Sequence, residues 1–81
     1  MAVEVLALEL APSIRVNGIA PGVIDWPEQM PQQQRQEYLK RVPLARAGTP
    51  EEAASLCRWL ILESRSMTGQ IMRLDGGRWL N

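Results

Sequence analysis

Few side chains in this 81-residue sequence could carry chemistry. It has no histidine, and its only tyrosine and only lysine, Tyr38 and Lys40, stand two positions apart in a polar stretch. Residues two positions apart on a helix point in very different directions. We therefore predict that both side chains face solvent and that they do not form a catalytic pair.

A second candidate is the segment in which Asp25 and Glu28 flank Trp26. An indole can stack on a flat ring, and a carboxylate can accept hydrogen bonds from amino groups that the ring carries. This segment could therefore bind an amino-bearing ring. The alternative is a solvated loop in which Trp26 closes over the core, and the residues alone leave both open.

The single cysteine, Cys57, excludes an intrachain disulfide, and without histidine the common zinc ligand sets cannot be assembled. Cys57 lies on an apolar helical stripe, so we predict a small buried hydrophobe rather than a nucleophile. Trp59 and Trp79 are predicted to bury area at packing or subunit surfaces. The sequence thus predicts no catalytic residue and no metal site within the chain.

Charge and hydropathy limit the partners of this chain. Nine Lys and Arg balance nine Asp and Glu, so no cationic excess exists to bind nucleic acid or a membrane surface. No run of about 18 apolar residues could span a bilayer. Near the N-terminus stand Glu4 and Glu9, where a signal peptide would carry positive charge. We predict a cytoplasmic protein with no nucleic-acid or membrane partner.

Periodicity and capping residues predict five elements, in the order helix, strand, helix, helix, strand. The clearest boundary is Thr49-Pro50-Glu51-Glu52, a capping box with proline at the first helical position. The predicted elements are a helix over Met1–Ala11, a strand over Ile14–Ala20, a helix over Pro31–Arg41, a helix from Thr49 to Leu62 or Glu63, and a strand over Gln70–Leu74.

Two strands separated by helices cannot form a tight hairpin, so we expect them to pair in parallel. Parallel sheets are normally covered by helices on both faces, and two strands alone do not make such a sheet. The first helix has no start signal and is typical of the end of a longer helix. The fold class predicted is therefore α/β, with residues 1–81 forming one end of a larger domain and incomplete on their own.

Ligands of open α/β sheets bind beyond the carboxyl ends of the strands, where two glycine-bearing turns are expected. Pro21-Gly22-Val23-Ile24 follows the first strand, and Asp75-Gly76-Gly77 follows the second. A glycine lets a ligand approach main-chain amides and carbonyls closely. Taken alone, each of these segments is better explained as a plain turn.

Several motifs, in order and at matching spacing, resemble the C-terminal third of the short-chain dehydrogenase/reductases, and together they cover nearly the whole chain. Within that family the residues after each turn look most like those of pteridine reductases. The motifs are Leu6-Ala7-Leu8-Glu9-Leu10-Ala11-Pro12, Ile14-Arg15-Val16-Asn17-Gly18-Ile19-Ala20-Pro21-Gly22-Val23-Ile24, Thr68-Gly69-Gln70 and Leu74-Asp75-Gly76-Gly77, with Ile24-Asp25-Trp26-Pro27-Glu28 and Asp75-Gly76-Gly77-Arg78-Trp79-Leu80 for the subfamily.

The resemblance implies the C-terminal part of a Rossmann-like, three-layer domain in which NADPH delivers hydride to a pterin or dihydrofolate ring. It implies that the cofactor-binding half and the catalytic Tyr-x-x-x-Lys lie outside residues 1–81, so that the isolated chain is inactive. Relatives are commonly tetramers, which implies a homo-oligomeric complete protein.

By the same resemblance the nicotinamide borders Pro21, Gly22, Val23 and Ile24, and the backbone of Ile24 meets its carboxamide. The mobile substrate loop begins at Asp25 and Trp26. Many relatives bind the cofactor through a threonine at the position of Trp26, and this sequence departs from that pattern.

Three other functions stay open at this point. The first is a different activity of the same family, such as reduction of a 3-oxoacyl group or of a sugar or alcohol carbonyl. The second is a non-catalytic remnant that acts only by associating with reductase subunits. The third is a helix-turn-helix binder of nucleic acid, which the zero net charge and the eight-residue connection between the two later helices disfavour.

Overall fold

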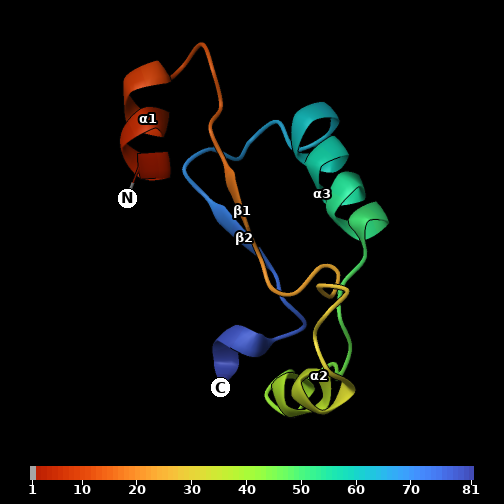
Figure 1. Cartoon of the computed structure of the whole chain (residues 1–81). Helices are drawn as coiled ribbons and strands as arrows, with labels where there is room; N and C mark the ends of the chain where they lie inside the picture. The colour runs from red at the N-terminus through yellow and green to blue at the C-terminus, as the bar shows by residue number, and fades with distance from the viewer. Residues whose placement is uncertain (1) are drawn as a thin grey trace.

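A computed structural model describes residues 2–81 and confirms the predicted order of the main elements (Figure 1). Met1, which the first predicted helix includes, lies outside the described residues. A short 3-10 helix near the C-terminus was not predicted. The elements are α1 (Ala2–Leu10), β1 (Gly18–Pro21), α2 (Gln32–Leu39), α3 (Pro50–Leu62), β2 (Ile71–Leu74) and the 3-10 helix η1 (Arg78–Leu80).

The two strands pair in parallel, as predicted, with Gly18 opposite Ile71 and Pro21 opposite Leu74. Figure 1 shows α1 and α3 on opposite sides of this pair, which gives a helix, sheet and helix layering. The prediction that the first strand begins at Ile14 is wrong, because β1 begins only at Gly18. The residues before Gly18 use their polar groups for contacts with the end of α3 and with the segment that precedes β2.

Arg15 closes the C-terminal end of α3. Its guanidinium donates to the carbonyl oxygens of Leu60 at 2.9 Å and Ile61 at 3.1 Å, and also to that of Ser64. The last carbonyls of a helix have no partner within the helix, and positive charge is favourable there. One side chain therefore fixes α3 against the chain that leads into β1.

Asn17 joins the entrances of the two strands. Its side-chain amide donates to the Met67 carbonyl at 3.0 Å, and its side-chain oxygen accepts from the Gln70 amide at 3.1 Å. Beside it the Val16 amide donates to the Thr68 hydroxyl at 3.1 Å. These bonds hold the segment before β2 in place and so set the register of the strand pair.

Helix α3 begins and ends where the sequence predicts. The Thr49 hydroxyl accepts from the Glu52 amide at 3.1 Å, and the Glu52 carboxylate accepts from the Thr49 amide at 2.9 Å. The Arg46 guanidinium lies 2.7 Å from the same carboxylate. The hydrogen bonds from Arg46 and from the Thr49 amide lower the pKa of Glu52 to about 2, from an ordinary value of 4.5.

The core is small and the apolar surface is large. The buried apolar residues among 2–81 are Ala7, Val42 and Leu60, whereas Cys57 is exposed, so the prediction of a buried Cys57 is wrong. The accessible surface is 6262 Å², against about 4,900 Å² for a compact 9.1 kDa monomer. The radius of gyration is 15.3 Å, against about 12 Å for a compact chain of this length.

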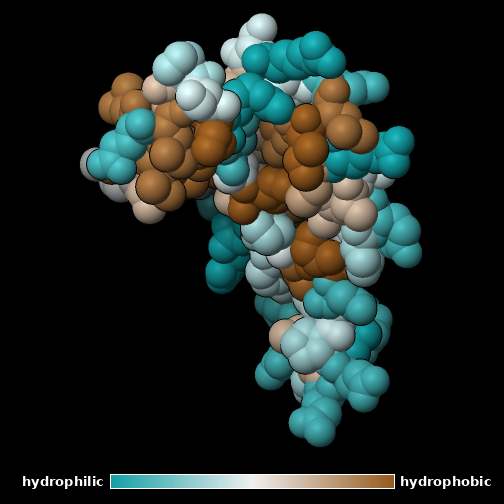
Figure 2. All heavy atoms as spheres, turned by 90° about the horizontal axis from the view of Figure 1, so that it is seen from above, coloured by the Kyte–Doolittle hydropathy of each residue, from teal (hydrophilic) through white to brown (hydrophobic). Residues whose placement is uncertain are grey.

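Figure 2 shows apolar side chains open to solvent over one end of the molecule, with a polar arm extending from the other. Leu8 of α1 is 81% exposed and Ile61 of α3 is 69% exposed. These faces carry the residues that a complete α/β domain would bury. In residues 2–81 no helix is long and apolar enough to cross a membrane.

Protonation of Glu52 in acid should weaken the start of α3. Because its pKa is lowered by folding, the carboxylate stabilises α3 at pH values above about 4.5, and this contribution is lost as the pH falls toward about 2. We expect the helical circular dichroism of the chain to fall over this window. Glu52→Gln should remove most of that pH dependence, and Glu51→Gln should keep it. The idea fails if Glu52→Gln titrates as the native chain does.

Candidate functional site

The two glycine-bearing turns lie side by side at the carboxyl ends of the strands. The Gly22 amide donates to the Leu74 carbonyl at 3.0 Å. A Cβ atom on Gly22 would stand 2.9 Å from both the Cα and the Cβ of Asp75, closer than such atoms approach. Gly22 therefore lets the two turns pack together, which is a structural reason for a glycine at this position.

The second turn is built around Asp75. Its carboxylate accepts from the Gly77 amide at 3.0 Å and from the Trp79 amide at 3.2 Å, which starts η1. Gly76 and Gly77 have φ of 63° and 91°, in the left-handed region that favours glycine. The Asp75 carboxylate is thus engaged within its own turn.

In the first turn, some main-chain amides and carbonyls form hydrogen bonds and others do not. The Val23 carbonyl accepts from the Gly48 amide at 2.9 Å. Neither the amide nor the carbonyl of Ile24 has a hydrogen-bond partner within residues 2–81. Ile24 therefore offers an adjacent donor and acceptor at the edge where ligands of such sheets bind.

Trp26 packs on α2. Its ring meets that of Tyr38 edge-on, with centroids 5.9 Å apart and an interplanar angle of 87°. The guanidinium carbon of Arg35 lies 5.8 Å from the Trp26 ring centroid. The Asp25 carboxylate accepts from the Trp26 amide at 2.9 Å. The sequence leaves two possibilities for this loop, and the binding of a ring by it stays a prediction.

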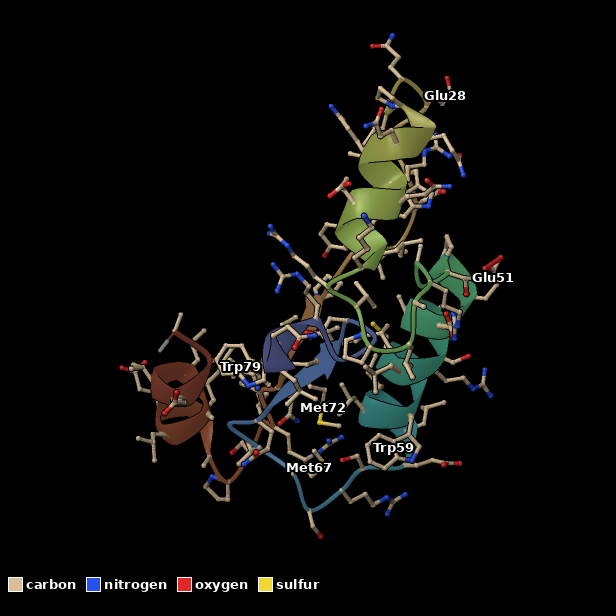
Figure 3. All side chains as sticks on the ribbon, turned by 90° about the horizontal axis from the view of Figure 1, so that it is seen from below. Glu28, Glu51, Trp59, Met67, Met72 and Trp79 are labelled. Atoms are coloured by element: carbon tan, nitrogen blue, oxygen red, sulfur yellow. The ribbon has the colours of Figure 1, made fainter. Side chains whose placement is uncertain are left out.

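Tyr38 is half-buried, so the prediction that it faces solvent is wrong. It lies between Trp26 and the guanidinium of Arg78, whose carbon is 6.0 Å from the Tyr38 ring centroid. Lys40 is exposed and pairs with Glu37 at 3.3 Å, as a solvent-facing lysine would. Glu28 is exposed and lies near one end of α2 (Figure 3).

Two hollows border the strand pair. One, of about 610 Å³, lies beside the turns and is lined by residues that include Pro21, Gly22, Tyr38 and Arg78. Sequence reasoning missed Arg78, because its partner Tyr38 is 40 positions away and no local pattern joins them. The other hollow, of about 800 Å³, has an apolar wall lined by Ile14, Ile19, Cys57, Leu60 and Ile61.

No group of three or more His, Cys, Asp or Glu side chains that could hold a metal ion occurs in the described part of the chain. Trp59 and Trp79, expected at packing surfaces, are 42% and 67% exposed here. At this edge of the sheet the residues present free main-chain groups and aromatic rings.

A family model described as Enoyl-(Acyl carrier protein) reductase matches residues 1–78. The chain is 47% identical over 68 residues to a 3-oxoacyl-(acyl-carrier-protein) reductase of Thermotoga maritima, covering 80% of this chain and 28% of that protein. It is 41% identical over 85 residues to glucose 1-dehydrogenase 2 of Bacillus subtilis, covering 99% of this chain and 33% of that protein.

Solved structures agree with these relatives. A short-chain dehydrogenase from Bacillus anthracis superposes with a TM-score of 0.84 at 36% identity, over 99% of this chain and 33% of that one. A short-chain dehydrogenase/reductase (glucose/ribitol dehydrogenase) from Brucella melitensis gives a TM-score of 0.80 at 33% identity, over 95% and 30%.

The fold and the matches define a segment of a Rossmann-type domain. The chain belongs to the short-chain dehydrogenase/reductases, a family that uses NAD(P) cofactors. It spans about a third of the length of the relatives described above. The family and the fold class expected from the sequence are thus confirmed, whereas the resemblance to pteridine reductases in particular gains no support from these relatives.

The packing of the second turn predicts a sharp difference between two glycine substitutions. A Cβ on Gly76 would lie 2.7 Å from Cγ1 of buried Val42, and the left-handed backbone adds about 1–2 kcal/mol of strain. A Cβ on Gly48 would meet nothing closer than 3.7 Å. We expect Gly76→Ala to lower the urea midpoint clearly and Gly48→Ala to leave it within experimental error. Equal midpoints would contradict this packing.

Proposed function

We propose that this chain forms the nicotinamide edge and the substrate loop of an NAD(P)-dependent reductase that acts on a carbonyl group. The observation that carries the proposal is the pair of free main-chain groups of Ile24 at the carboxyl edge of the strands. A carboxamide has one acceptor oxygen and one donor nitrogen, and an adjacent amide and carbonyl complement it.

Pro21, Gly22 and Val23 complete the cofactor side of this proposal. They place Ile24 beyond the end of β1, and the bond from the Gly48 amide to the Val23 carbonyl holds the turn in position. The nicotinamide cofactor supplies the hydride when it is bound. The resemblance implies NADPH, and we keep NADPH as the expected cofactor, with NADH as the alternative that the measurements below distinguish.

Carbonyl reduction is better supported than pterin reduction as the activity. The relatives described above are named as a 3-oxoacyl reductase and a glucose dehydrogenase. At the proposed substrate residues, the Asp25 carboxylate already accepts from the Trp26 amide, which leaves less of it for an amino-bearing ring. Trp26 itself packs against Tyr38 and Arg35 on α2. We therefore favour a 3-oxoacyl or sugar carbonyl over a pterin or folate as the substrate.

Two hybrid enzymes would test this function. In one hybrid, the chain replaces the matching segment of the Thermotoga maritima reductase. In the other, it replaces the matching segment of the Bacillus subtilis dehydrogenase. We expect both hybrids to reduce the same carbonyl substrate, since the substrate loop comes from this chain. The substrates tested are a 3-oxoacyl thioester, a sugar, dihydrobiopterin and dihydrofolate, each with NADPH and with NADH. Turnover of pterins alone, or of nothing, would reject the proposal.

The role of Ile24 has its own matched pair of variants. Ile24→Pro removes the main-chain donor, and we expect it to raise the KM for the cofactor about tenfold, the effect of one lost hydrogen bond. Ile24→Val keeps the donor and should leave this KM unchanged. The 81-residue chain alone should show no turnover, since no acid and base are paired at its site.

We also propose that the complete protein is a homotetramer. The exposed apolar faces of α1 and α3 support this, because the resemblance places both helices at subunit contacts. Trp59, on the outer face of α3, is 42% exposed. We expect the hybrids to sediment as tetramers. Trp59→Glu should lower the mass of the sedimenting assembly, and Glu51→Gln is the neutral control. A monomeric native hybrid would reject this assembly.

A further inference from the structure

Residues 26–39, which comprise α2 and the loop before it, form an arm that we call the α2 arm. The α2 arm is attached to the rest of the molecule through the C-terminal turn. We call residues 41–44 the α2 stem and residues 75–81 the C-terminal turn. The Leu44 amide donates to the Gly76 carbonyl at 3.0 Å, and the Asn81 side chain donates to the Arg41 carbonyl at 3.2 Å. Figure 1 shows α2 and the C-terminus at the same end of the strand pair.

Close packing strengthens this attachment. A Cβ atom on Gly77 would stand 2.9 Å from Cγ of Pro43, as one on Gly76 would clash with Val42. The side chains of Val42 and Pro43 in the α2 stem therefore pack directly on the glycine backbone of the C-terminal turn, and the direction in which α2 leaves the stem depends on where that turn lies.

Arg78 extends the attachment to the helix itself. Its guanidinium lies 6.0 Å from the centroid of Tyr38 in α2 and is oriented by a 2.8 Å hydrogen bond to the Asn81 carbonyl. Within residues 2–81 it forms no ion pair with an aspartate or glutamate side chain. Its charge is therefore available to the face of the Tyr38 ring, an attraction typical of a cation on an aromatic ring.

The loop that carries Trp26 is bound to α2 as well. Arg35 donates to the Met30 carbonyl at 3.1 Å and to the Pro27 carbonyl at 3.2 Å, and it covers the Trp26 ring. Trp26 also meets Tyr38 edge-on. Residues 26–39 are thus joined by side-chain contacts, and a shift of Tyr38 would carry Trp26 with it.

We propose that Arg78 is a positioning residue for the substrate side of the site. Through Tyr38, and together with the bond from Asn81 to the α2 stem, it holds α2 and Trp26 in place beside the carboxyl ends of the strands. Loss of its charge frees α2 and weakens substrate binding, without touching the groups that carry the reaction. This inference rests on the proposed function for its substrate, and on the contacts above for its geometry.

The test uses the hybrid enzymes with three variants. Arg78→Ala removes the cation, Arg78→Lys keeps it, and Arg41→Ala removes an exposed cation beside α2 whose side chain has no ring contact. Hydrogen exchange of residues 32–39 and the KM and kcat for the carbonyl substrate are measured in each. For Arg78→Ala we expect about fivefold faster exchange and an about fivefold higher KM at unchanged kcat. Arg78→Lys should restore most of both, and Arg41→Ala should match the native hybrid.

Unchanged exchange in Arg78→Ala would overturn the proposal, and so would faster exchange with an unchanged KM. A fall in kcat at constant KM would also overturn it, because positioning of the substrate loop acts on binding. If the native hybrids turn over no substrate, the proposed function has failed, and the exchange of Arg78→Ala alone then decides: faster exchange supports the attachment of α2 through Arg78, and unchanged exchange rejects it.

Discussion

The arrangement of this chain depends on one guanidinium. Arg15 stands just before β1 and bonds to three carbonyls at the end of α3, 45 or more residues along the chain. A helix end needs partners for these carbonyls, and with Arg15 in this position α3 runs along one side of the strand pair. Asn17 then fastens the segment before β2 to the entrance of β1. Because the N-terminal ends of the two parallel strands are held together, their C-terminal ends also lie together, and the turns at Gly22 and Asp75 meet at the same edge of the sheet.

Under the proposed function, the same edge lets the chain contribute to an enzyme through binding. The residues of the turns serve to build the turns themselves. The Asp75 carboxylate accepts hydrogen bonds within its own turn, and Gly22 has no Cβ that would clash with Asp75. What remains for a ligand is the main chain of Ile24 and the rings on the arm. Membership of the short-chain dehydrogenase/reductases, and a length of about a third of the relatives compared, agree with such a binding contribution.

Features encoded by neighbouring residues could be predicted from the sequence, and features made by distant ones could not. The start of α3 follows from Thr49 and Glu52, and the end of β2 follows from Asp75 with its glycines. The late start of β1 depends on Arg15 bonding to α3, which no local pattern shows. The burial of Cys57 was predicted from a stripe whose apolar face borders an open hollow. The turns of the candidate site were found because they are local, whereas the contact of Arg78 with Tyr38 was not.

The contact of Gly76 with Val42 has a consequence for variation among related sequences. Because the two residues share one small volume, any side chain at the first position requires a smaller one at the second. The positive φ of Gly76 further restricts the replacing residue to types that tolerate a left-handed conformation, such as asparagine. Replacements at these two sites should therefore arise as compensated pairs, and an aligned collection of homologues would carry that dependence as correlated change between columns 34 positions apart.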